Sequence, residues 1–204
     1  KNGMAIERFV KNILVDPAIN TDTLLVGDKN AVLVASRITG YGELYEAKTI
    51  CPSCTATSKQ EYDLESLEVY HGDDWGEYEV RQSGDNFIVT VPQTKVDVEV
   101  RLLTSRDEQY LAKLTESKRK KKLPESALTD QLKLIIASVN GYDDGKSINT
   151  FVDGMPAKDS AYLRRAYEKL VPNVDLSVPF SCPSCGFEQE VSMPFTAAFF
   201  WPNR

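Results

Sequence analysis

The order of apolar and polar positions along the chain predicts a mixture of helices and β-hairpins. Apolar residues recur at helical spacing in residues 6–14 and 30–39, and the wide apolar surface of the second segment indicates a buried helix. Alternating runs at residues 87–91 and 96–102 are separated by the short segment 92–95. This pattern predicts a β-hairpin.

Further helical patterns follow the hairpin. Thr104 or Ser105 is expected to cap a long helix that runs into the cationic stretch 118–122, and Pro124 interrupts it. Another helix is predicted to begin near Glu125 and to include Ile136, and shorter helices follow before the chain returns to alternating strands. Helices and strands are interspersed without a regular strand–helix–strand repeat, so the predicted fold class is α+β.

The four cysteines of the chain form two copies of one tetrapeptide, each flanked by alternating runs. The copies are Cys51-Pro52-Ser53-Cys54 and Cys182-Pro183-Ser184-Cys185. A strand, a C-x-x-C turn and a returning strand form a zinc knuckle, and two facing knuckles supply the four thiolates of a closed tetrahedral site. A contiguous zinc ribbon separates its pairs by about 15–20 residues, far fewer than here. The sequence therefore predicts one discontinuous zinc ribbon.

Three other interpretations of the cysteines stay open from the sequence: disulfides within each pair, disulfides between the pairs, or a redox motif. A redox C-x-x-C opens a helix that lowers the thiol pKa, and neither pair precedes a helical pattern. Paired thiols without a secretion-signal pattern indicate a reducing compartment, where zinc is expected rather than a disulfide. We expect one structural Zn²⁺ per chain, bound by Cys51, Cys54, Cys182 and Cys185.

Composition is that of an ordinary soluble globular protein. The 204 residues are 42% hydrophobic and 26% charged, with a formal net charge of −6, which gives no global electrostatic basis for binding nucleic acid. No apolar run approaches the roughly 20 residues that span a bilayer. We expect residues 1–204 to form a single compact unit. Its expected parts are the split zinc ribbon, 43–63 with 174–194, a hairpin-plus-helix module, 85–122, and a helical segment, 125–171.

The sequence contains no clear catalytic constellation. Gly145-Lys146-Ser147 resembles the end of a phosphate-binding loop, but the first glycine of that motif should stand at position 140, which is Asn140. A turn followed by a helix capped by Ser147 is the plainer interpretation. His71 is the only histidine, so a Ser-His-Asp or zinc-hydrolase site would have to be built around one loop residue. We expect a protein that is not an enzyme.

Two further segments are candidates for binding a partner. The cations of residues 118–122 are typical of a solvated helix end, and they could also bind an acidic partner or a nucleic-acid backbone. A zinc-ribbon nucleic-acid-binding protein is therefore the alternative function, although the acidic remainder makes it the weaker one. The aromatic tail, Phe199, Phe200 and Trp201, could pack beneath the second knuckle or anchor the chain in a neighbouring protein.

Several segments together resemble the baseplate hub family of T-even-type contractile-tailed bacteriophages, described as baseplate hub proteins or hub assembly chaperones. The segments are Gly27-Asp28-Lys29-Asn30-Ala31, Tyr41-Gly42-Glu43-Leu44-Tyr45-Glu46, Phe151-Val152-Asp153-Gly154-Met155-Pro156-Ala157-Lys158-Asp159-Ser160, Leu163-Arg164, Cys182-Pro183-Ser184-Cys185-Gly186 and Phe199-Phe200-Trp201-Pro202. The resemblance covers nearly the whole chain. The first knuckle departs from the second in having Thr55 where Gly186 follows the cysteines.

The resemblance implies a non-enzymatic role in tail assembly, in the virion baseplate or in the host cytoplasm while the tail is built. It implies other hub proteins as partners, with the tape-measure protein as a further candidate, and a structural zinc that joins the two ends of the chain. Family members begin with a hairpin and helix ahead of the region that matches Lys1. We therefore expect this chain to lack an N-terminal hairpin-helix segment that residues 87–108 resemble.

Overall fold

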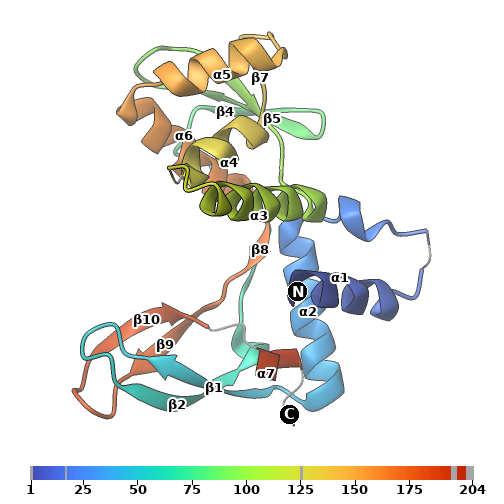
Figure 1. Cartoon of the computed structure of the whole chain (residues 1–204), viewed down its shortest axis with the longest axis vertical. Helices are drawn as coiled ribbons and strands as arrows, with labels where there is room; N and C mark the ends of the chain where they lie inside the picture. The colour runs from blue at the N-terminus through green and yellow to red at the C-terminus, as the bar shows by residue number, and fades with distance from the viewer. Residues whose placement is uncertain (1, 17, 125, 194–196, 201–204) are drawn as a thin grey trace. The chain divides into compact units, whose positions relative to one another are not determined.

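The structure is a computed structural model of the chain and describes residues 2–16, 18–124, 126–193 and 197–200. The chain divides into two compact units rather than the single one expected (Figure 1). Unit 1 contains Lys1–Lys29 and His71–Pro172, and unit 2 contains Asn30–Tyr70 and Asn173–Arg204. The division arises because the two cysteine segments build a small core of their own, separate from that of the central segment.

Unit 1 is a four-stranded antiparallel sheet with helices. Its strands, in the spatial order β4-β5-β6-β7, are Val80–Ser83, Asn86–Thr90, Asp97–Val100 and Ile136–Val139. Its helices are α1 (Asn2–Ile13), the 3₁₀ turn η1 (Thr21–Thr23), α3 (Ser105–Lys120), α4 (Ala127–Ile135), α5 (Gly145–Gly154) and α6 (Ala157–Leu170). Helix α2 (Val26–Tyr41) begins in unit 1 and ends in unit 2.

Alternation along the strands separates the two faces of the sheet. Val89, Val98 and Val100 point into a core that also contains Leu163 and Leu170 of α6. The same core contains buried residues of α4 and α5. The other face is polar. On it, the central strand β6 carries Asp97, which accepts hydrogen bonds from Arg81 and Thr90, and Glu99, which accepts them from Asn86 and Ser138. Opposite faces of one strand therefore build the core and the polar surface.

Strand β7 was not predicted. The helix expected to include Ile136 ends at Ile135, and the chain continues as a strand beside β6. A short apolar run fits a helix and a buried strand equally well. Here the β-branched residues Ile136 and Val139 pack into the sheet, and the turn at Asn140 and Gly141, both with positive φ, closes the strand.

The turn of the predicted β5–β6 hairpin is held by a buried carboxylate from α6. Asp159 is fully buried, and its oxygens accept hydrogen bonds from the N–H groups of Gln93 (2.7 Å) and Thr94 (3.0 Å) and from the Thr94 hydroxyl (2.7 Å). Burial would raise the pKa of Asp159, but these hydrogen bonds outweigh it and lower the pKa. Asp159 belongs to residues 151–160, one of the segments that carry the family resemblance, and its side chain stabilises the hairpin turn.

The chain enters unit 1 at His71 and leaves it after Pro172. Close to these two points, the backbones of Gly72 and Leu170 are in close contact. Gly72 has a φ of +77°, and a Cβ atom at this position would lie 2.5 Å from the carbonyl oxygen of Leu170. Only glycine combines this backbone conformation with such an approach. The ends of the segment His71–Pro172 are therefore fixed side by side.

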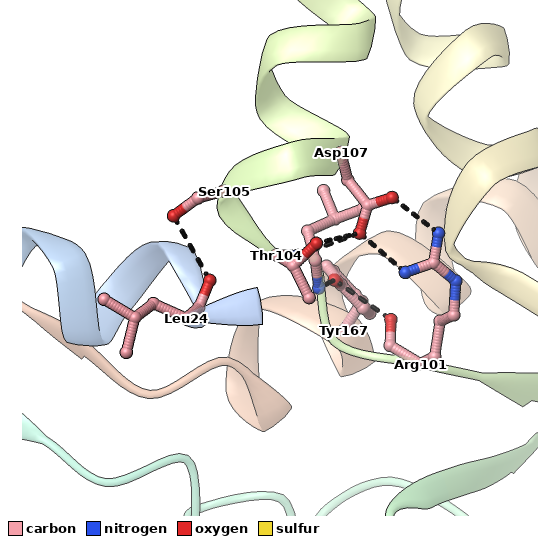
Figure 2. A network of polar contacts seen from close by, with 7 residues as sticks. Leu24, Arg101, Thr104, Ser105, Asp107 and Tyr167 are labelled. Carbon is pink, nitrogen blue, oxygen red and sulfur yellow. Dashed lines mark hydrogen bonds and ion pairs between the residues drawn. The ribbon is translucent and has the colours of Figure 1, made fainter. Parts of the chain in front are cut away.

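The start of α3 is held by a charged network (Figure 2). Both oxygens of Asp107 accept hydrogen bonds from the Arg101 guanidinium, at 2.6 and 2.9 Å. One of them also accepts the Thr104 N–H and hydroxyl, so that Thr104, rather than Ser105, is the N-cap residue. The Arg101 hydrogen bonds are the main cause that lowers the pKa of Asp107 to about 2.

The same network fastens two other segments to α3. The Tyr167 hydroxyl accepts the Leu103 N–H (3.1 Å) and donates to the Arg101 carbonyl (3.3 Å), and burial raises the pKa of Tyr167 to about 12. The Ser105 N–H and hydroxyl both donate to the Leu24 carbonyl. The network therefore joins α6 and the segment that precedes α2 to one helix N-terminus (Figure 2).

Unit 2 contains the end of α2 and three antiparallel strand pairs. The pairs are β1 (Leu44–Ile50) with β2 (Thr57–Asp63), β9 (Ser177–Ser181) with β10 (Glu188–Ser192), and β3 (Val69–Tyr70) with β8 (Asn173–Val174). The 3₁₀ turn η2 (Leu64–Ser66) and the short helix α7 (Ala197–Phe200) complete it. With unit 1, this confirms the predicted α+β class. Among the described residues, no helix has the length and apolar character needed to cross a membrane.

The first prediction concerns Asp107. Replacing it by Asn should lower the free energy of unfolding of unit 1 by about 2 kcal/mol at pH 7, because a carboxylate with a pKa near 2 in the folded state has a pKa near 3.9 when unfolded. A lowered pKa stabilises the fold above pH 4, and this stabilisation is lost as the pH falls toward 2. Urea unfolding, followed by Trp75 fluorescence in a Trp201→Phe background, measures the difference between pH 7 and pH 2.5.

The matched control is Asp85→Asn, at an exposed turn residue. It should change the free energy of unfolding by less than about 0.5 kcal/mol. A difference between wild type and Asp107→Asn that stays constant down to pH 2.5 would show that the carboxylate charge does not stabilise this network.

Candidate metal centre

The two cysteine hairpins bring four sulfur atoms together in unit 2. All four Sγ atoms lie within 4.8 Å of one another. The Sγ atoms of Cys51 and Cys185 are 3.8 Å apart, and those of Cys54 and Cys182 are 3.7 Å apart. A regular tetrahedron with Zn–S bonds of about 2.3 Å has sulfur–sulfur edges of about 3.8 Å, whereas a disulfide bond measures about 2.05 Å. The thiols are free and fit a tetrahedral metal ion.

Each hairpin turns in the same way around its cysteines. In both, the N–H of the first cysteine donates to the carbonyl five residues later, and the N–H four residues later donates back to the carbonyl of that cysteine. The hydrogen bonds are Cys51 to Ala56 (2.9 Å) and Thr55 to Cys51 (3.0 Å), then Cys182 to Phe187 (2.9 Å) and Gly186 to Cys182 (2.9 Å). The repeated tetrapeptide therefore builds the same turn twice, and the turns place the two cysteine pairs opposite each other.

The residue after each turn has a left-handed backbone. Gly186 has a φ of +69°, which glycine adopts without steric cost, whereas Thr55 has a φ of +60°. A β-branched residue is strained in this region, because its Cβ approaches the backbone carbonyl. The departure of the first knuckle from the second thus has a structural consequence, although Thr55 is not a ligand.

The second prediction follows from this strain. Thr55→Gly should raise the free energy of unfolding of unit 2 by about 1 kcal/mol, since it removes a left-handed conformation that is unfavourable by roughly 1–2 kcal/mol and gives back part of that gain as chain entropy. Gly186→Thr should lower it by a similar amount. Thermal unfolding of the two metal-loaded variants measures both shifts. Shifts of equal sign in the two variants would contradict a shared turn geometry.

The cluster has one buried side and one exposed side. Cys51 and Cys182 are buried with Phe180, and Phe187 and Val191 pack against them. Cys54 and Cys185 are exposed. The apolar side excludes water from the first cysteine of each pair. Four sulfur ligands would fill all four positions of a tetrahedral ion and leave none open for water or a substrate. Such closure is typical of structural zinc.

The ionisation of each thiol depends on its neighbours, because the four sulfur atoms lie close together. Burial would raise the pKa of Cys182, but backbone N–H groups of Ser184 and Cys185 donate to its sulfur and lower the pKa to about 6. At Cys185 the N–H of Phe187 lowers the pKa, but the neighbouring sulfurs and burial outweigh it and raise the pKa to about 12. Thiolates this close oppose one another's ionisation, and a divalent ion would remove that opposition.

Arg37 of α2 holds the strand that leads to the first knuckle. Its guanidinium donates to the carbonyls of Gly42 (2.9 Å) and Leu44 (3.0 Å) and lies over the rings of Tyr41 and Tyr45. The side chain is buried, and its Nε has no hydrogen-bond partner in the part of the chain that the structure describes. Sequence reasoning missed this residue, whose only signal was a cation inside an apolar helix.

The aromatic tail packs against β1 rather than beneath the second knuckle. Phe199 is fully buried and Phe200 nearly so. The rings of Phe199 and Tyr45 meet edge to face, with centroids 5.0 Å apart. Trp201 lies outside the described residues. Two of the three tail aromatics are therefore core side chains of unit 2 in this structure, and their role in binding a partner stays a prediction.

Comparison with protein families identifies the chain. A family model described as T4 bacteriophage base plate protein matches residues 1–201. The chain belongs to this family. As a base plate protein, it has its place in the phage tail, and its partners are other base plate proteins. Searches of curated proteins and of solved structures found no match.

The remaining candidate residues of this base plate protein lie in unit 1, outside the cysteine cluster. His71 is exposed. Gly145-Lys146-Ser147 forms the first turn of α5, and the helix is capped by Asp144 rather than Ser147. The Asp144 carboxylate accepts the N–H groups of Lys146 (3.1 Å) and Ser147 (2.9 Å). Those N–H groups therefore already bind an anion that the protein itself supplies.

The cationic stretch is partly neutralised within unit 1. Lys118 contacts Asp130, with 2.6 Å between Nζ and a carboxylate oxygen, and Lys120 contacts Glu116 at 2.7 Å. The half-buried Lys118 also donates to the Ser126 hydroxyl. The stretch thus holds α3 to α4 through Lys118, and its charge available to a partner is smaller than the sequence alone indicates.

The third prediction tests whether the cysteine cluster of the base plate protein binds zinc. Cys182→Ser should reduce bound zinc from one ion per chain to less than about a tenth, and unit 2 should unfold at a lower temperature, because metal binding and folding are coupled in small ribbons. Zinc content by mass spectrometry and the melting of unit 2 by circular dichroism measure the two effects. Ser184→Ala, between two ligands but not itself one, is the matched control and should retain the full zinc content. A Cys182→Ser protein with full zinc and unchanged melting would refute the shared site.

Proposed function

We propose that this base plate protein is a non-enzymatic component of the base plate hub, and that a structural zinc ion stabilises it. The match of residues 1–201 to the base plate family carries the proposal. The four converging thiols support the second part, since their spacing fits a closed tetrahedral site. In a second form of this proposal, the protein is an assembly chaperone of the hub and leaves before the particle is complete.

Zinc would act on the folding of unit 2. The hairpins β1–β2 and β9–β10 come from parts of the chain that are far apart, and both belong to unit 2. Cys51, Cys54, Cys182 and Cys185 would hold the ion, whose chemistry is to bind four thiolates at once and so join the hairpins. Closing so long a loop is unfavourable in the unfolded chain, and a bound metal offsets that loss of entropy. The result would be a rigid body suited to a particle under mechanical load.

A non-enzymatic role agrees with the chemistry of the described residues. The lone histidine is exposed on a loop, the backbone of α5 is capped by Asp144, and the cysteines face one another. These three features therefore give no support for a catalytic site in the part of the chain that the structure describes. The proposed partners are other hub proteins and the tape-measure protein, which the protein would meet in the host cytoplasm during assembly.

The fourth prediction separates the two forms of the proposal. Quantitative mass spectrometry of purified virions should find the protein at a fixed, small copy number relative to a tail-tube protein measured in the same sample. Lysates of infected cells serve as the control for expression. Abundance in lysates together with absence from virions would refute the hub component and leave the assembly chaperone. Absence from tail-assembly intermediates as well would overturn both forms.

A further inference from the structure

The two units differ in charge far more than in size. Unit 2 has nine Asp and Glu residues against four Lys and Arg, a net charge of −5, whereas unit 1 has a net charge of −1. Four thiolates around one divalent ion would make unit 2 more negative by two further charges. A surface of one sign attracts partners of the other and repels copies of itself.

Strand β10 is an edge of unit 2. It pairs with β9 alone among the described strands, so the backbone N–H and C=O groups on its outer side have no strand beside them. Its residues Glu188, Gln189 and Glu190 are all exposed. An exposed edge is a template for another strand, and charged side chains restrict which strand can pair with it. The carboxylates here oppose pairing with a second copy of β10.

A hollow of about 420 Å³ lies against this hairpin. The residues that line it are Gln60 of β2, Pro179, Phe180 and Ser181 of β9, and Glu188, Gln189 and Glu190 of β10. A lysine or arginine side chain has an apolar stem and a cationic head, which match such a lining. Glu188 has a single long contact, from the Ser181 hydroxyl at 3.5 Å, and neither Glu188 nor Glu190 forms an ion pair within the described part of the chain.

We propose that β10 is a docking site for an extended, basic segment of another protein, which adds as a strand to its outer edge and places a cationic side chain in the hollow. Backbone hydrogen bonds would supply affinity, and the alternate carboxylates would supply specificity. Glu188 and Glu190 are two residues apart, and side chains at this spacing lie on one face of the strand about 7 Å apart. The partner segment therefore carries Lys or Arg at alternate positions. The site requires a folded unit 2 but neither the hub role nor retention in the virion.

The test uses the zinc-loaded full chain and a fluorescein-labelled peptide of eight residues in which lysine and valine alternate. Fluorescence anisotropy at low salt should show saturable binding. A second peptide has the same composition with four lysines followed by four valines. It should bind about tenfold more weakly, because it cannot match the alternation along β10. Amide hydrogen exchange in residues 188–192 should slow on binding of the alternating peptide alone.

Two double variants locate the site. Glu188→Gln with Glu190→Gln should weaken binding of the alternating peptide about tenfold, the effect of losing two exposed charge pairs. Glu65→Gln with Glu68→Gln removes the same charge from exposed positions elsewhere in unit 2 and should leave binding within about twofold. Zinc content and circular dichroism confirm that each variant is folded. Equal losses in both variants, equal binding of the two peptides, or no saturable binding would each overturn the docking site, and none of these results bears on the hub proposal.

Discussion

The convergence of four thiols from two distant hairpins is the constraint on which unit 2 depends. The two-stranded hairpins are too small to be stable alone, and their buried apolar residues, Phe180 together with the flanking Phe187 and Val191, form a core of only a few side chains. The cysteines Cys51 and Cys182 are part of that core as well as candidate ligands. Metal binding at these cysteines would therefore be coupled to folding of the unit, because two of the candidate ligands also supply its packing.

Unit 1 is stabilised differently, by one buried and one partly buried carboxylate that tie its elements together. Asp159 of α6 holds the β5–β6 turn, and Asp107 joins the end of β6 to the start of α3 through Arg101. Both have lowered pKa values, because hydrogen bonds to the ionised form outweigh the effect of burial. Such groups specify one arrangement of elements, since a displaced helix would leave a buried charge without partners.

The sequence predicted the parts of the molecule that depend on local pattern or on repeated chemistry. The CPSC pairs indicated the thiol cluster because two identical motifs in one chain favour joint binding of one metal ion, and the alternation around residues 92–95 indicated the hairpin. The sequence did not predict β7, since a short apolar run does not distinguish a strand from the end of a helix. Nor did it predict Arg37 or the role of Asp159, whose partners lie in segments that only the tertiary fold brings together. The division into two units was missed for the same reason.

The two units differ in how many of their acidic residues are paired with cations. Several acidic residues of unit 1 are paired internally, as Asp130 is with Lys118 and Asp97 with Arg81. In unit 2 Lys59 contacts Glu46, and Arg37 is buried against carbonyls, which leaves few cations to offset the remaining carboxylates. A rigid, negatively charged body with an open strand edge interacts most favourably with an extended cationic chain, because backbone pairing and charge then act together. Whatever stabilises the cysteine cluster would therefore also preserve the surface that selects the partner.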